Sequence, residues 1–512
     1  MKKINNSIPI SHHKLSIGMI LFFASALFVI LFSRCTSPLY SVFDILPDQS
    51  FFQVVGFNWL EGRIPYRDLF DLKGPMIFAI NAAGYWLTGN RYGICIIQTV
   101  LMFFNFIYCY KLLRVEFSDL VSIAVTVIVF LCFADPVYDK GDNVEESVLP
   151  FIFASCYYGY TWLRQYDSNK ETSVKVFIPA LFGIVLGIST MTRITNAVGV
   201  CILALYIGII LTYERKYKEL LVCVISFFTA AIVICLPFII YFWHKGALSD
   251  LIYSMFIFAS RYATQYNDKT PITLYNLSMF FSSALLLCVA VLFLFSKAKF
   301  RRTCEAFFLT ALASSSWLLY SIRLPKYTEV MLPYAAIAVC LIHLNYKSSQ
   351  KTAFAGYVLA TIAAIYCLFG STKYTYYCLR TNKIVMDENA KKDEDTKSIL
   401  KLLDNVPLSD KKQTILIDNI TQNFIYIYIH ATPPYKYFAF QSQQSALDKE
   451  LFNAEIKTYK NGNAQYIIAR DNNNNLTTAQ KKCHTQFMEI IHKRYDIIDH
   501  NGQMILYRIK QL

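Results

Sequence analysis

The chain has 512 residues, of which 55% are hydrophobic and only 16% charged, and its formal net charge is +14. A soluble domain usually carries about 25% charged residues, so this composition excludes a soluble enzyme, a disordered chain and a fibrous repeat. The apolar residues fall in long blocks, which predicts a polytopic α-helical membrane protein with enough chain left for a domain outside the membrane.

The excess of Lys and Arg indicates topology signals in short loops. It does not indicate a nucleic-acid partner, because no basic face or known motif gathers the charge. The 14 cysteines are mostly scattered singly through apolar blocks, without metal-ligand spacing, which argues against a zinc site and a disulfide framework. We therefore expect no nucleic acid and no cofactor, with a divalent metal as the alternative that stays open.

The membrane part is predicted from stretches of about 20 apolar residues, the length that crosses the hydrocarbon core. The first, Leu15–Ser33, follows a basic segment and lacks an obvious cleavage site, so we interpret it as an uncleaved anchor. Further stretches bring the prediction to about eleven spans within a transmembrane domain over 1–370. They are 92–113, 119–135, 148–163, 176–190, 197–213, 220–242, 276–296, 304–320, 328–345 and 352–370.

The predicted orientation follows from the charges of the short loops. With a cytoplasmic N-terminus, every connection on the cytoplasmic side carries Lys or Arg, as the positive-inside rule requires. An odd number of spans then places segment 34–91 and the tail outside the cytoplasm. This arrangement predicts a multi-pass protein of the cell inner (cytoplasmic) membrane.

The tail, residues 371–512, changes in character. A helical pattern over Lys391–Leu403 gives way to strand-like runs at Thr414–Asp418, Ala464–Ala469 and Met504–Ile509. We therefore expect a small extracytoplasmic α/β domain at the C-terminus.

The first external segment, 34–91, has short amphipathic pieces at Phe51–Leu60 and Met76–Leu87 that could lie along the membrane interface. A carboxylate there can act as a general base on a hydroxyl, and nearby Lys or Arg can hold a phosphate. A solvated loop with salt bridges is the alternative. The candidate residues are Asp44, Asp48, Tyr66, Arg67, Asp71 and Lys73.

Two further polar sites lie between predicted spans. Glu145 and Glu146 stand at the mouth of a helix, where facing lipid would be costly, so we expect them to face a cavity. An exposed surface turn is the alternative. Arg193 lies on the external side, and an arginine at the membrane edge is a functional candidate, with snorkelling to the interface as the alternative.

The residue order in the first external segment resembles the first external loop of GT-C glycosyltransferases. The similar branch comprises protein O-mannosyltransferases, lipid A aminoarabinose transferases and bacterial polysaccharide transferases. The resemblance implies that Asp48 is the catalytic carboxylate, with Asp44 as its competitor, and that Lys73 contacts the lipid phosphate. The matching pattern is Asp48, then Gly62-x-x-Pro65-Tyr66-x-Asp68, then Asp71-x-Lys73-Gly74-Pro75.

Weaker similarities to the same family extend along the chain. The string from Asn143 to Phe151 resembles its second acidic loop, which implies acceptor positioning or charge balance for the two glutamates. Arg261 matches an Arg-aromatic element that binds lipid phosphate, and Lys326-Tyr327 is similar to a pair that precedes an apolar helix. The metal-using branch has Glu directly before the Lys, where this chain has Leu72, with Asp71 one residue earlier, so the resemblance itself implies no metal and a divalent metal stays open.

Together these features predict sugar transfer from a polyprenyl-phosphate donor to a lipid, glycan or protein acceptor on the extracytoplasmic face. The resemblance implies one inverting displacement, with Asp48 as the base and the donor phosphate among Lys73, Arg261 and Arg193. Tyr66 is a further candidate, either for stacking on the sugar or for flanking the prenyl chain, and packing within the protein is the favoured alternative. The alternatives are a transporter or flippase of lipid-linked sugars, a polymerase or ligase, and a non-catalytic scaffold that displays the tail.

Overall fold

The structure is a computed structural model. It describes residues 12–134, 137–138, 140–170, 173–265, 300–320, 325–346, 350–351, 354–362, 364–365, 376, 393–407, 415–439, 441–470 and 476–510.

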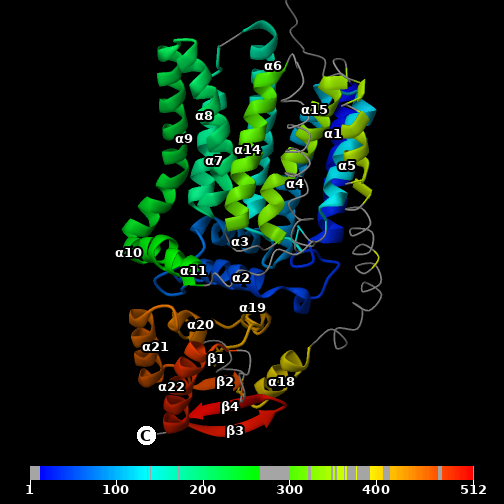
Figure 1. The fold of residues 1–512 in the computed structure, drawn as a ribbon. Helices are drawn as coiled ribbons and strands as arrows, with labels where there is room; N and C mark the ends of the chain where they lie inside the picture. The colour runs from blue at the N-terminus through cyan, green and yellow to red at the C-terminus, as the bar shows by residue number, and fades with distance from the viewer. Residues whose placement is uncertain are drawn as a thin grey trace, which may run out of the picture.

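The larger part of the molecule is a bundle of long helices that stand side by side (Figure 1). Among the residues that the structure describes, five segments are long and apolar enough to cross a membrane, and α5 and α7 are shorter apolar helices. The predicted span 276–296 lies outside the described residues and 352–370 only partly inside, so the total of eleven stays a prediction. The bundle helices are α1 (His12–Phe32), α4 (Tyr92–Arg114), α5 (Asp119–Cys132), α6 (Leu149–Asn169), α7 (Phe177–Thr190), α8 (Val198–Tyr213), α9 (Tyr217–His244), α14 (Arg301–Tyr320) and α15 (Leu332–Tyr346).

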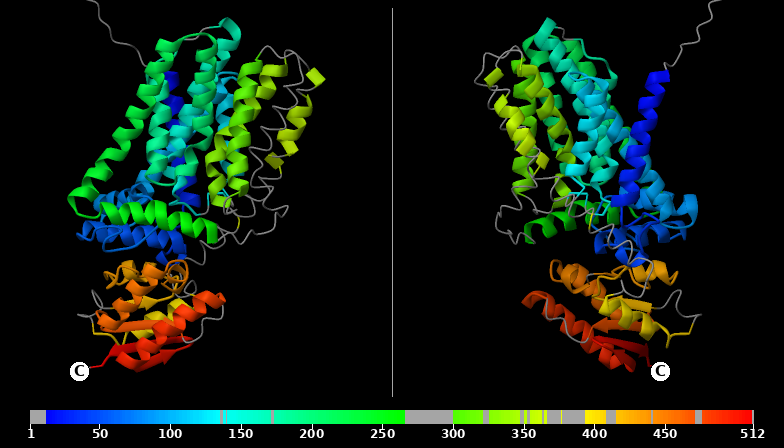
Figure 2. Two further views of the ribbon diagram at one scale, coloured as in Figure 1. Left: turned by 60° about the vertical axis from the view of Figure 1, so that its left-hand side comes forward. Right: turned by 90° about the vertical axis from the view of Figure 1, so that its right-hand side faces the viewer.

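Short helices lie across one end of the bundle, which we call the layered end (Figure 2). The two amphipathic pieces expected in segment 34–91 are helices here, and each begins with a proline whose fixed φ suits a first helical position. The helices of the layer are α2 (Pro47–Leu60), α3 (Pro75–Thr88), α10 (Leu248–Ile252), a π-helical turn (Tyr253–Phe258) and α11 (Ala259–Gln265).

The opposite end of the bundle holds the connections α4–α5, α6–α7 and α8–α9. These carry the basic residues that the sequence groups on one side of the membrane, including Arg114, Lys175 and Lys216. The grouping of basic residues at one end agrees with the expected topology. Which side of a membrane this end faces stays a prediction.

Residues 393–510 form a carboxyl-terminal unit beyond the layered end (Figure 1). Its four-stranded sheet has the order β1-β2-β4-β3, with β1 parallel to β2 and the other pairs antiparallel. The three expected strands are present, while the expected domain boundary at 371 lies outside the described residues. The elements are α18 (Glu394–Leu403), β1 (Ile415–Asp418), α19 (Phe424–Tyr428), α20 (Gln441–Ser445), α21 (Lys449–Asn461), β2 (Tyr466–Arg470), α22 (Thr478–Arg494), β3 (Tyr495–Asn501) and β4 (Met504–Ile509).

The carboxyl-terminal unit packs directly on the layer. The Phe51 ring of α2 stacks on Phe438 with 4.7 Å between ring centroids. The backbone N–H of Phe70 donates to the Lys436 carbonyl over 2.8 Å, and Lys436 Nζ lies 2.6 Å from Asp250 Oδ1. These contacts fix the layer between the bundle and the sheet.

Candidate active site

Asp48 lies in the first turn of α2 and meets a residue from the far end of the sequence. Lys326, in the 3-10 segment Pro325–Met331 before α15, donates from Nζ to Asp48 Oδ2 over 2.7 Å. The Asp48 side chain is 40% exposed and that of Lys326 only 14%. The carboxylate is therefore held in place and still accessible to a second molecule.

The charge state of Asp48 is set by its surroundings. Burial of part of the group raises its pKa, but the positive charges of Lys73 and Lys326 and the Lys326 hydrogen bond lower the pKa further, to below its ordinary value. Asp48 is consequently ionised throughout the neutral range. An ionised, accessible carboxylate can accept a proton from a hydroxyl group.

The backbone around Lys73 is held by two side chains of the same loop. The Asp71 carboxylate accepts a hydrogen bond from the Lys73 N–H over 3.0 Å, and the Tyr66 hydroxyl donates to the Lys73 carbonyl over 2.7 Å. Asp71 is buried, and burial raises its pKa to about 6 although Lys73 lowers it. Asp71 and Tyr66 thus position Lys73.

Of the roles considered for Tyr66, the structure supports packing and contradicts stacking on a sugar. Its side chain is fully buried, and its ring packs against Phe78 and Phe242 with centroids 6.0 Å and 5.4 Å away. A ring enclosed in this way cannot lie against a sugar, so its contribution is to the packing of the loop.

Gly74 brings the Lys73 turn against the chain that leads to Arg193. Its N–H donates to the Thr192 carbonyl over 3.1 Å, and the N–H of Met76 donates to the Met191 carbonyl over 3.0 Å. A Cβ atom on Gly74 would lie 2.2 Å from the Met191 carbonyl oxygen. Only glycine therefore permits this approach.

Arg193 joins two of the other expected site residues. Its guanidinium lies 3.2 Å from the centroid of the Tyr327 ring, and Nη1 lies 3.3 Å from Glu145 Oε1. Glu145 is almost completely buried, whereas the Arg193 side chain is 20% exposed. Because Tyr327 directly follows Lys326, the contacts form a continuous chain from Asp48 to Glu145.

Glu146 has different hydrogen-bond partners from those of Glu145. It accepts hydrogen bonds from the Asn143 N–H over 2.9 Å, from Gln98 Nε2 over 2.8 Å and from the Tyr138 hydroxyl over 3.3 Å. Burial raises its pKa to about 8 in spite of these hydrogen bonds. Glu146 therefore supports the second loop from behind the site.

Asp142 was not singled out from the sequence, although it occupies a central position. Its carboxylate accepts from Gln53 of α2 over 3.1 Å and from Asn81 of α3 over 3.0 Å. Burial raises its pKa to about 6. The only sequence signal for Asp142 is its place among the acidic residues that precede Glu145 and Glu146. Nothing in that segment indicates that Asp142 connects α2 and α3.

The remaining expected residues have other partners. Arg67 pairs with Asp68 over 2.9 Å and is 44% exposed. Arg261, expected to bind lipid phosphate, pairs with Asp448 of the carboxyl-terminal unit. Asp44 lies in the turn Val42–Asp44, and its side chain is outside the described part of the structure. These contacts do not bring Arg67 or Arg261 into the chain from Asp48 to Glu145.

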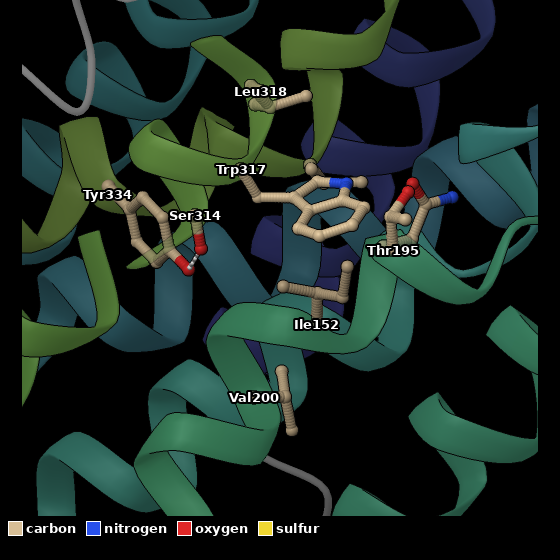
Figure 3. A pocket seen from close by; sticks show the side chains of 9 residues that line it. Ile152, Thr195, Val200, Ser314, Trp317, Leu318 and Tyr334 are labelled. Atoms are coloured by element: carbon tan, nitrogen blue, oxygen red, sulfur yellow. Dashed lines mark hydrogen bonds between the residues drawn. The ribbon is translucent and has the colours of Figure 1, made fainter. Parts of the chain in front are cut away.

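A small cavity lies beside the segment that follows Arg193 (Figure 3). Ser314 and Tyr334 share a hydrogen bond of 3.0 Å at its wall, and Trp317 reaches toward Thr195. Its volume is about 10 Å³, which is at most room for one water molecule. A cavity of this size is too small to hold a monosaccharide.

Among the residues that the structure describes, no group of three His, Cys, Asp or Glu side chains is arranged to hold a metal ion. The expectation that the protein needs no cofactor stays a prediction.

Comparison with known proteins gives a match in structure alone. The sequence matches no family model and no curated protein. The fold is similar to that of ArnT from Cupriavidus metallidurans bound to undecaprenyl phosphate, with a TM-score of 0.58, 11% identity, and 96% of this chain and 97% of ArnT covered. For ArnT in the apo state the TM-score is 0.55 at 10% identity, over 96% of this chain and 98% of ArnT. ArnT, a lipid A aminoarabinose transferase, has the GT-C fold, which confirms the GT-C fold that the resemblance implies.

Proposed function

We propose that this chain, which has the GT-C fold of ArnT, is an integral-membrane glycosyltransferase that moves a sugar from a polyprenyl-phosphate donor to an acceptor. The observation that carries the proposal is the 2.7 Å contact between Asp48 and Lys326, directly beside the Arg193–Tyr327 pair. It supplies an accessible carboxylate among cations at one end of a membrane bundle.

The donor phosphate is proposed to lie among Lys73, Lys326 and Arg193. A lipid donor presents its phosphate at the membrane surface, and these three cations lie at the layered end of the bundle, which would meet that surface. Ammonium and guanidinium groups form charge-assisted hydrogen bonds with phosphate oxygens. Arg261 is proposed to join them by exchanging the carboxylate of Asp448 for the phosphate.

The proposed reaction is a single displacement. The acceptor hydroxyl oxygen attacks the anomeric carbon, and Asp48 takes the hydroxyl proton as the new C–O bond forms. The bond from the anomeric carbon to the phosphate oxygen breaks, and polyprenyl phosphate leaves with the electron pair. The configuration at the anomeric carbon is inverted. Lys73 and Lys326 stabilise the negative charge on the leaving phosphate.

Glu145 and Glu146 are proposed to act on the site without bonding changes. Glu145 balances the charge of Arg193 and holds its guanidinium on the Tyr327 ring. Glu146 keeps the second loop in place, and its raised pKa leaves it mostly protonated at neutral pH. Of these three carboxylates, Asp48 is therefore the one that is both ionised and accessible, and it is the one proposed to take part in the reaction.

The position of the site weighs against a transporter. Transporters bind their substrates near the middle of the membrane, at the interface of internal repeats. Here the chain from Asp48 to Glu145 lies at the layered end. A polymerase or ligase has the same location but takes a diphosphate-linked donor, so the donor itself distinguishes it.

The proposal is tested with the purified full-length protein and radiolabelled polyprenyl-phosphate monosaccharides, with the matching diphosphate-linked sugars as the second arm. We expect consumption of a monophosphate donor, release of polyprenyl phosphate and an inverted anomeric configuration in the product. Consumption of diphosphate donors alone would identify a polymerase or ligase. Retention of configuration would contradict the single displacement.

A further inference from the structure

A hollow of about 420 Å³ lies between α7, α8 and α9, away from the site. Its walls are apolar side chains such as Phe182 of α7, Leu205 of α8 and Phe227 of α9. Binding sites for small molecules usually have volumes of about 300–1,000 Å³. The hollow is therefore large enough to hold part of a lipid.

Small residues on α7 and α8 create this hollow. A Cβ atom on Gly183 would lie 2.0 Å from the Phe227 carbonyl oxygen, and one on Gly187 would lie 2.8 Å from the Ala231 carbonyl oxygen, so α7 and α9 are in backbone contact. On α8 the wall is formed partly by Ala204 and Gly208. Because Ala204 and Gly208 have little or no side chain, α8 does not fill the space beside α7 and α9.

The hollow extends toward the end of the bundle opposite the site, where its lining includes Val174 and Leu220. Four exposed cations stand in the connections beside these two residues. Lys175 directly follows Val174, and the α8–α9 connection and the start of α9 supply the others, which are Arg215, Lys216 and Lys218.

Two acids, Glu214 and Glu219, lie near this rim, so the charge of the four cations is balanced only in part. Glu214 accepts a hydrogen bond from the Tyr166 hydroxyl over 2.6 Å, and Glu219 lies in the first turn of α9. The ion pairs described at this end join other residues, namely Arg164 to Glu116 and Arg301 and Arg302 to Glu305. An excess of positive charge therefore borders an apolar hollow, which is complementary to a lipid with a negative headgroup.

We propose that the hollow binds an acyl chain of an anionic phospholipid, with the headgroup phosphate held by Lys175, Lys216 and Lys218. Basic pockets between membrane helices recognise anionic headgroups. The headgroup lies at the opposite end of the bundle from Asp48, so this lipid is distinct from the sugar donor. The site does not depend on the proposed transferase activity.

The test is native mass spectrometry of the full-length protein after exchange into micelles with equal amounts of phosphatidylglycerol and phosphatidylcholine. We expect the wild type to retain phosphatidylglycerol preferentially. The variant K175Q/K216Q/K218Q should lose this preference, by about fivefold for each cation removed. Ala204→Phe and Gly208→Leu, which fill the hollow, should reduce retention of both lipids.

The control is Lys111→Gln, a cation at the same end but on α4, whose ammonium lies over the Tyr108 ring. It should leave the preference unchanged, and the thermal unfolding midpoint of each variant reports its fold. An unchanged preference in the triple variant would overturn the proposal. The proposal would also be overturned if polyprenyl phosphate displaced phosphatidylglycerol from the wild type but not from Ala204→Phe. That result would assign the hollow to the donor's prenyl chain.

Discussion

Arg193 is held between Tyr327 and Glu145, which come from different parts of the chain. Its guanidinium lies 3.2 Å from the Tyr327 ring centroid, and Nη1 lies 3.3 Å from Glu145 Oε1. Since Glu145 is buried, its charge depends on this arginine for compensation. The pair therefore fixes the geometry of the second acidic loop at the site.

The stability lost when Arg193 is replaced should be partly recovered when the buried charge of Glu145 is removed as well. Arg193→Ala leaves Glu145 buried without its partner, which should cost about 3–5 kcal/mol of stability. Glu145→Gln added to Arg193→Ala should restore much of the unfolding midpoint while transfer stays impaired. The measurement is thermal unfolding in detergent beside a transfer assay. A double variant no more stable than Arg193→Ala would contradict the unpaired charge of Glu145 as the cause of the loss.

Lys326→Met should move the acid limb of activity. Lys326 lowers the pKa of Asp48, so its removal leaves burial less opposed and raises that pKa. The acid limb of kcat/KM against pH should move upward by about one pH unit or more, because an opposite charge in contact lowers a carboxyl pKa by about 1–3 units. Lys245→Met, an exposed lysine at the same end, is the control. An unmoved limb in Lys326→Met would exclude Asp48 as the titrating base.

Gly74→Ala should disturb the site through the backbone. The new Cβ atom would lie 2.2 Å from the Met191 carbonyl oxygen, which forces the Lys73 turn away from Arg193. We expect a loss of about 1–3 kcal/mol, the usual cost of overpacking, together with a higher KM for the donor. Gly18→Ala is the matched control, because nothing lies within 4 Å of its Cβ position. Equal stability and donor KM for the two variants would contradict this role of Gly74.

Glu146 should make the protein less stable as the pH rises. Its pKa is about 8 in the folded chain and near 4.5 when unfolded, so between these values the folded state binds more protons. Stability contributed by protonated Glu146 is then complete below about pH 4.5 and is lost toward pH 8. Glu146→Gln, which mimics the protonated form, should flatten the fall in unfolding midpoint between pH 5 and pH 8. The same slope in both proteins would contradict the raised pKa.

The sequence predicts the helices well and the pairing of charges poorly. Apolar length alone locates α1, α4 and α9 within a few residues, because each block must cross the hydrocarbon. Asp48 and Lys326 are 278 positions apart, and no local pattern encodes their contact. The partner of Arg261 was missed for the same reason, since Asp448 lies 187 positions away.

Two other differences have local physical causes. β3 contains Asp496, Asp499 and His500 and pairs only with β4 at the edge of the sheet, so its polar sequence does not resemble a buried strand. Tyr66 belongs to the motif that resembles GT-C loops, yet it is buried and donates to the Lys73 carbonyl. A motif residue can therefore be required for the shape of the loop while making no contact with a substrate.

The most direct measurement is the single-turnover rate of sugar transfer by Asp48→Asn compared with Glu61→Gln. Both residues are acids at opposite ends of α2, and Glu61 is exposed. If Asp48 accepts the acceptor's proton, Asp48→Asn should reduce the rate by about 10²–10⁴-fold, with donor binding and the unfolding midpoint retained, while Glu61→Gln keeps the wild-type rate. Wild-type transfer by Asp48→Asn would show that the carboxylate beside Lys326 is not the base.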